Sequence, residues 1–232
     1  MQEIKNSINW YLVKINKSVA TIETFRPPVI HDDLRFQYSV LIESIFSLID
    51  YIEDKKVVFN NDKFQIERKI KKEIGSEGNI IVDYMRELRN SIIHRGADAT
   101  SAGNVVKDRV AVLAPDNVTS RNGTLIQKPK EIFLDKLLAV LDNATKNVII
   151  SELNGQNILE ENNTQSISDL VIKLKNMPLP HNAPNIIKMM IVEQRKKTSE
   201  EDFLSLATEI YNSSLVNLMK NLEVRMNVQH LS

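Results

Sequence analysis

The chain of 232 residues contains no cysteine, and its 30 lysine and arginine residues balance its 30 aspartate and glutamate residues. The lack of cysteine excludes a disulfide scaffold, a zinc site built on thiolates and a cysteine nucleophile. With a net charge of zero, no field of the whole molecule attracts nucleic acid or an anionic membrane, so any site for a polyanion must be local.

The first predicted helix covers about residues 2 to 25. It ends at Arg26-Pro27-Pro28, because a proline disfavours helical backbone in the residue before it. Its start, MQEIKNSINWYLVKINKS, is interrupted by charges and lacks the apolar run of a secretion signal, and no later segment is apolar enough to span a bilayer. We therefore expect a soluble, cytoplasmic protein with no membrane partner. Trp10, the only tryptophan, is expected in the core.

The second predicted helix, residues 32 to 54, has the clearest pattern in the chain. Its apolar positions are spaced alternately by four and three residues, which is typical of an amphipathic helix. These positions are Leu34, Tyr38, Leu41, Ile45, Leu48 and Ile52. Asp32 or Asp33 is expected to cap the helix. Glu43 interrupts the broad apolar surface and either lines a cleft or is solvated.

Three further helices are predicted at about residues 62–74, 80–94 and 131–153. The inner face of the middle one is expected to carry Ile81, Met85, Leu88 and Ile92. Short links between these segments favour antiparallel neighbours in a helical bundle.

Residues 97 to 130 break the helical pattern. A β-branched run, an Asn122-Gly123 turn signal and a second short apolar run predict a β-hairpin insertion at about residues 105–127. After Gly155 the sequence predicts three more helical segments, the last of which begins after a capping residue, Ser199. The expected fold is all-α: an antiparallel bundle over residues 1–153 with this insertion, followed by a helical C-terminal extension over residues 154–232.

The end of the fourth predicted helix, RELRNSIIHRG, is rich in polar groups. Arg86, Asn90 and His94 share one sector of the helix, whereas Arg89 is separated from His94 by about 140° and about 7.5 Å of rise. One interpretation needs no chemistry, because basic residues favour the negative end of a helix dipole and Gly96 is suited to end the helix.

The string Arg89-Asn90-Ser91-Ile92-Ile93-His94 also resembles the signature of the HEPN superfamily (higher eukaryotes and prokaryotes nucleotide-binding). That signature is an arginine, usually followed by a polar residue, then four to six residues and a histidine, and here four residues lie between Arg89 and His94. The order of an apolar helix, a shorter basic helix and the motif helix is similar as well. The resemblance covers roughly residues 1–153, and the hairpin insertion departs from the minimal HEPN bundle.

This resemblance implies a metal-independent endoribonuclease, as found in toxin, phage-defence or RNA-processing systems, with no cofactor. The expected partners are RNA, a second copy of the chain that completes a composite active site, and an antitoxin or another defence protein. His94 would be the acid/base group, Arg89 the phosphate clamp and Asn90 an orienting hydrogen-bond partner. Arg86 and Arg95 would bind substrate by adding positive charge to the shared cleft.

Two alternatives stay open. The first is a HEPN-type module without catalysis that binds a nucleotide or a partner protein, and the second is an unrelated helical scaffold. The other histidines, His31, His181 and His230, share no metal-ligand spacing with one another, so the sequence predicts no metal site.

Overall fold

The computed structural model describes residues 2–54, 65–160, 163–179, 181 and 183–231. These residues form eight α-helices and one antiparallel two-stranded sheet, so the fold is all-α with a small β-hairpin insertion, as predicted. No helix among them combines the length and the apolar character needed to cross a membrane.

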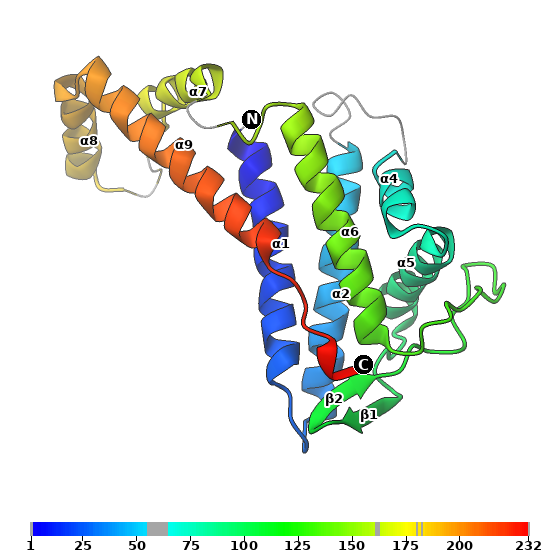
Figure 1. Ribbon diagram of the computed structural model, residues 1–232. Helices are drawn as coiled ribbons and strands as arrows, with labels where there is room; N and C mark the ends of the chain where they lie inside the picture. Colours follow the sequence, from blue (N-terminus) through cyan, green and yellow to red (C-terminus); the bar gives the residue numbers. More distant parts are fainter. Residues whose placement is uncertain (1, 55–64, 161–162, 180, 182, 232) are drawn as a thin grey trace.

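Helices α1 (Gln2–Thr24) and α2 (His31–Asp54) form an antiparallel pair at the centre of the bundle (Figure 1). All six apolar positions predicted for α2 are buried, which confirms the helical pattern. Asp32 and Asp33 lie in the first turn of α2 instead of capping it, and there their charges favour the helix dipole. Trp10 is 59% exposed, so the prediction of a core tryptophan was wrong. The buried stripe of α1 consists of Ile4, Ile8, Leu12, Ile15, Val19 and Ile22, and it leaves position 10 outside.

The bundle is completed by α4 (Gln65–Ile74), α5 (Gly78–Arg95) and α6 (Leu134–Gly155). The start predicted for the helix at residues 62–74 lies outside the described residues, whereas its end at Ile74 agrees. Ile81, Met85 and Leu88 of α5 are buried, and Ile92 packs against the same core. Helix α5 packs on both α2 and α4, so the candidate motif lies at the edge of a rigid scaffold.

The insertion contains a short hairpin of β1 (Gly103–Val106) and β2 (Arg109–Val112). Its two-residue turn is Lys107-Asp108, with φ angles of 46° and 63°, as a type I′ turn requires. Asn122-Gly123 was therefore the wrong choice for the hairpin turn. It lies in a separate turn closed by a single bridge between Thr119 and Leu125.

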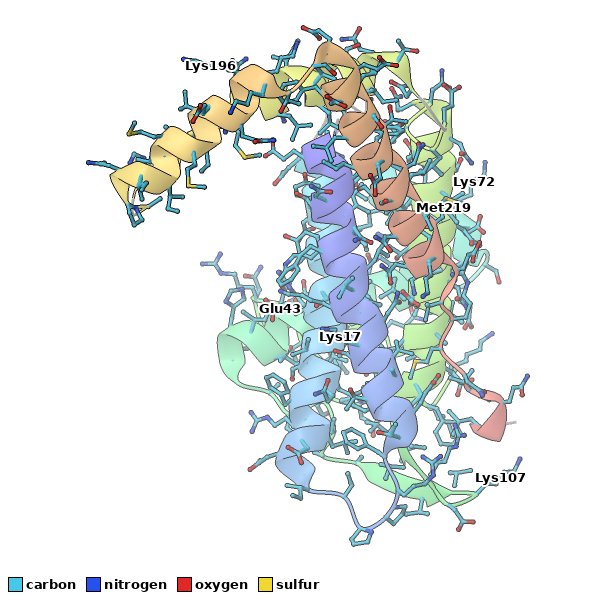
Figure 2. All side chains as sticks on the ribbon, turned by 90° about the vertical axis from the view of Figure 1, so that its left-hand side faces the viewer. Lys17, Glu43, Lys72, Lys107, Lys196 and Met219 are labelled. Atoms are coloured by element: carbon cyan, nitrogen blue, oxygen red, sulfur yellow. The ribbon has the colours of Figure 1, made fainter. Side chains whose placement is uncertain are left out.

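The C-terminal extension consists of α7 (Thr164–Lys175), α8 (Asn185–Lys197), α9 (Glu200–Glu223) and the 3₁₀ helix η1 (Gln229–Leu231), which includes the three helical segments predicted. Ser199 caps α9 in a reciprocal capping box with Asp202, as the sequence indicates. The far end of α9 packs into the bundle core, to which Leu218, Leu222 and Met226 contribute. Helix α8 has no buried residue and stands apart from the bundle (Figures 1 and 2).

Two lysine side chains are fully buried where the extension meets the bundle. Lys146 of α6 contacts the Asp142 carboxylate at 2.7 Å and donates to the Val224 carbonyl at 2.9 Å. The Nζ of Lys5 on α1 lies 3.4 Å from the centre of the Tyr211 ring on α9 and makes no hydrogen bond within the described part of the chain. These contacts fix α9 against α1 and α6.

Candidate functional site

The candidate motif occupies the last two turns of α5, whose end is formed by Gly96. Gly96 has a φ of 65°, and its N–H group donates to the carbonyl of Ser91, so it closes the helix in the left-handed conformation that glycine tolerates best. His94 and Arg95 lie in the last turn, where a positive charge is favoured by the dipole. The helix-end interpretation of these three residues is therefore confirmed. A catalytic role for His94 would be additional to its place at the helix end.

Arg89 is half-buried and has no carboxylate partner among the described residues. Its only side-chain hydrogen bond in that part of the chain is a long one of 3.5 Å from a terminal nitrogen to the amide oxygen of Asn90. Its Nε is buried without a hydrogen-bond partner. A guanidinium in this state retains most of its donors for an anionic ligand.

Asn90 and His94 lie one turn apart on the same side of the helix. The amide nitrogen of Asn90 is 3.5 Å from the Glu87 carboxylate, so Asn90 connects Arg89 to an acidic neighbour. The His94 side chain is exposed and has neither a hydrogen bond nor an ion pair with any described residue. The structure thus joins Arg89 to Asn90 and leaves the imidazole of His94 open to solvent, with no contact between His94 and Arg89 among the described residues.

Arg86 is held inside the protein by two ion pairs. Its guanidinium lies 3.0 Å from Asp50 of α2 and 2.6 Å from Glu67 of α4, and it stacks over the Phe46 ring at 4.8 Å. These contacts compensate its charge and join α5 to both neighbouring helices. To bind substrate, as the sequence suggested, Arg86 would have to leave them.

Arg95 is similarly engaged with the loop that follows the hairpin. It donates to the Thr119 hydroxyl at 2.8 Å and to the Ser120 carbonyl at 3.1 Å, and it also contacts the Thr119 carbonyl and the Ser91 hydroxyl. Its side chain therefore fixes this loop beside the end of α5. Of the five residues proposed from the sequence, three remain open to a ligand and two serve the fold.

The start of α2 brings two further side chains to the end of α5 that the sequence did not indicate. Arg35 donates to the Gly96 carbonyl at 2.9 Å, and the Nε2 of His31 lies 3.0 Å from the Asp98 carboxylate. These pairs join residues more than 60 positions apart, so no spacing along the chain could have revealed them.

Asp98 is itself held in place by Thr100, whose N–H and hydroxyl donate to one carboxylate oxygen at 2.8 and 2.7 Å. Partial burial raises the pKa of Asp98, but the hydrogen bonds from Thr100 and the charges of His31 and Arg35 outweigh it and lower the pKa below its ordinary value. Asp98 is thus a fixed anion beside the motif helix.

Glu43 is exposed on α2 (Figure 2). This exposure agrees with the solvated alternative for that residue.

Among the described residues, no group of three or more histidine or acidic side chains is arranged to hold a metal ion.

The fold and this site together define an all-α protein with a histidine, an amide and an arginine that has no carboxylate partner among the described residues, all at one helix end. Comparisons with protein-family models, with curated proteins and with solved structures found no match for the chain.

Proposed function

We propose that the protein is a metal-independent endoribonuclease of HEPN type that acts as a homodimer. The observation that carries this proposal is the state of Arg89, whose guanidinium has no carboxylate partner in the described part of the chain while Arg86, one turn earlier, has two. Arg89 is next to Asn90, and the exposed imidazole of His94 follows five residues later on the same helix. A cation without a carboxylate partner and a titratable group, brought together by a second copy of the chain, suit a phosphodiester substrate.

In the proposed reaction His94 removes the proton from a ribose 2′-hydroxyl group, and the resulting oxygen attacks the adjacent phosphorus. An imidazole suits this step because it can exchange a proton near neutral pH. Arg89 binds the non-bridging oxygens and stabilises the charge that grows on them, and Asn90 orients its guanidinium. The products are a 2′,3′-cyclic phosphate and a 5′-hydroxyl group.

A second copy of the chain is needed because Arg89 and His94 point about 140° apart on one ideal helix. A two-fold axis near the motif brings Arg89 of one protomer toward His94 of the other. Two large apolar side chains support such an interface, since Phe36 on α2 is 62% exposed and Ile93, between the motif residues on α5, is 40% exposed.

The direct test is cleavage of total RNA by the purified protein in the presence of a chelator. We expect the wild type to cut RNA and to leave cyclic phosphate ends, and we expect Arg89→Ala and His94→Ala each to lower the rate by about 100-fold or more. Arg68→Ala and His181→Ala are matched controls, because both side chains are exposed and distant in sequence from the motif. Equal cleavage by all five proteins would remove the assignment, since it would point to a contaminating nuclease.

A nucleotide-binding module without catalysis is the second candidate, and a separate hollow favours it. This hollow of about 610 Å³ is lined by α1, α2, α7 and α9, and Trp10, Tyr11 and Tyr51 contribute to it. Trp10 is exposed, and an exposed aromatic ring is suited to stacking on a base. Nucleotide binding at this hollow by a protein that leaves RNA intact would favour the module over the enzyme.

A further inference from the structure

The start of α2 and the end of α5 together place a second histidine beside the motif. His31 is the first residue of α2, and its ring contacts Asp98, which follows the end of α5 by three residues. The ring is 55% exposed, so one nitrogen faces a fixed anion while the rest of the ring remains open to a ligand.

The carboxylate that orients His31 has little freedom of its own. One oxygen of Asp98 accepts two hydrogen bonds from Thr100, and the other oxygen contacts the Nε2 of His31 at 3.0 Å. In such a pair the carboxylate fixes the orientation of the ring, so that one nitrogen faces Asp98 and the other can face a ligand. Arg35, one turn after His31, adds a further positive charge next to the Gly96 carbonyl.

His31 and His94 belong to the same end of the molecule. Asp98 is four residues after His94, so their Cα atoms are at most about 14 Å apart even in a fully extended chain. The contact of Arg35 with Gly96 fixes the start of α2 at the midpoint of that segment. The segments that carry the two imidazoles are therefore joined at Gly96.

We propose that His31, oriented by Asp98, is the general acid that protonates the leaving 5′-oxygen, while His94 is the general base. This inference rests on the proposed ribonuclease function. The 2′-oxygen forms a bond to phosphorus as its proton passes to His94, and the bond from phosphorus to the 5′-oxygen breaks as that oxygen takes a proton from His31. Both histidines then return to their starting states by proton exchange with water.

The test compares RNA with a substrate whose leaving group needs no acid. In uridine 3′-(4-nitrophenyl phosphate) the leaving group is a nitrophenolate, which departs without a proton. We expect His31→Gln to cleave RNA about 100-fold more slowly than the wild type but to cleave the nitrophenyl ester within roughly threefold of it, because only the first reaction needs general acid catalysis. His94→Gln should lose both activities, since each reaction needs the 2′-proton to be removed.

Asp98→Asn tests the positioning role of the carboxylate and should slow RNA cleavage by roughly tenfold, again with the ester spared. His181→Gln is the matched control and should leave both rates unchanged. Thermal unfolding of each variant checks that the fold is kept.

Two results would overturn the inference while the proposed function stands: full RNA cleavage by His31→Gln, or equal losses on both substrates, which would indicate a structural role for His31. A wild-type protein that cleaves neither substrate would overturn the proposed function and the inference together.

Discussion

Lys5 shows how strongly burial acts on a single charged side chain in this protein. Its side chain is fully buried, its ammonium group has no hydrogen-bond partner among the residues that the structure describes, and it lies over the Tyr211 ring. Burial lowers the pKa of Lys5 from 10.5 to about 8, because the charged form loses its hydration. At pH 7 the folded protein therefore holds a charge that the unfolded chain solvates better.

We expect Lys5→Met to raise the free energy of unfolding at pH 7 by roughly 1–3 kcal/mol. This advantage should shrink as the pH rises from 8 toward 10.5, because the folded wild type releases the proton of Lys5 before the unfolded chain does. Urea unfolding at pH 7, 8 and 9.5 measures the difference between the two proteins. An advantage that stays constant over this range would show that Lys5 keeps its proton when folded.

The candidate site was only partly predictable at the scale of residues. The sequence identified Arg89, Asn90 and His94 because they lie in one continuous string on one helix. It could not show that Arg86 and Arg95 are engaged elsewhere, since their partners come from other elements. His31 and Arg35 were missed for the same reason.

The junction of α4 and α5 depends on a close backbone approach. A Cβ atom at Gly78 would lie 1.9 Å from the carbonyl oxygen of Lys71, a distance that real contacts never reach. Glycine therefore allows α5 to start directly against α4. This approach also places Arg86 of α5 within reach of Glu67 of α4.

Gly78→Ala should lower the free energy of unfolding by about 3 kcal/mol or more, because backbone atoms must move to remove the clash. Gly155→Ala, at the end of α6, is the control, since a Cβ there meets nothing within 4 Å. That change should be neutral or stabilise by up to about 1 kcal/mol. The measurement is the urea concentration at the midpoint of unfolding for the wild type and for both variants. Similar midpoints for Gly78→Ala and Gly155→Ala would contradict the proposed role of Gly78.

At the scale of elements, the sequence predicted the helices well because their apolar stripes are long and regular. The ends of α1, α2 and α5 differ from the predicted ends by only one or two residues. The hairpin turn was misplaced because it is formed by Lys107 and Asp108, which adopt positive φ angles without a glycine to signal them. Asn122-Gly123 does form a turn, with a φ of 79° at Gly123, but this turn joins only a single bridge.

At the scale of the whole molecule, the proposed homodimer can be tested in solution by mixing two inactive variants. Mixing inactive Arg89→Ala protein with inactive His94→Ala protein should restore RNA cleavage. Each mixed dimer contains one composite site with both groups intact, so random exchange should recover about a quarter of the wild-type rate.

Chromatography with light scattering should show the dimer, and the mixing assay should follow incubation long enough for subunits to exchange. A site built within a single protomer would give no recovery, since every protomer in the mixture lacks one group. That result, together with an active wild type, would exclude the composite site.

The division of the chain at residues 153 and 154 stays a prediction, and the core shows why the sequence could not resolve it. Leu218, Leu222 and Met226 contribute to the same core as the first helices. The sequence shows that these residues form an apolar face. It does not show whether this face packs on the bundle or on another protein.

The packing of α9 on α1 also affects the synthesis of the protein. The amide group of Asn16 donates to the Asn221 carbonyl at 2.9 Å, and the N–H of Asn227 donates to Glu23 at 2.6 Å. These contacts join residues 205 and 204 positions apart, so α1 acquires its cover from α9 only after the intervening chain has been translated. Until then the side of α1 that α9 covers stays open to chaperones and proteases.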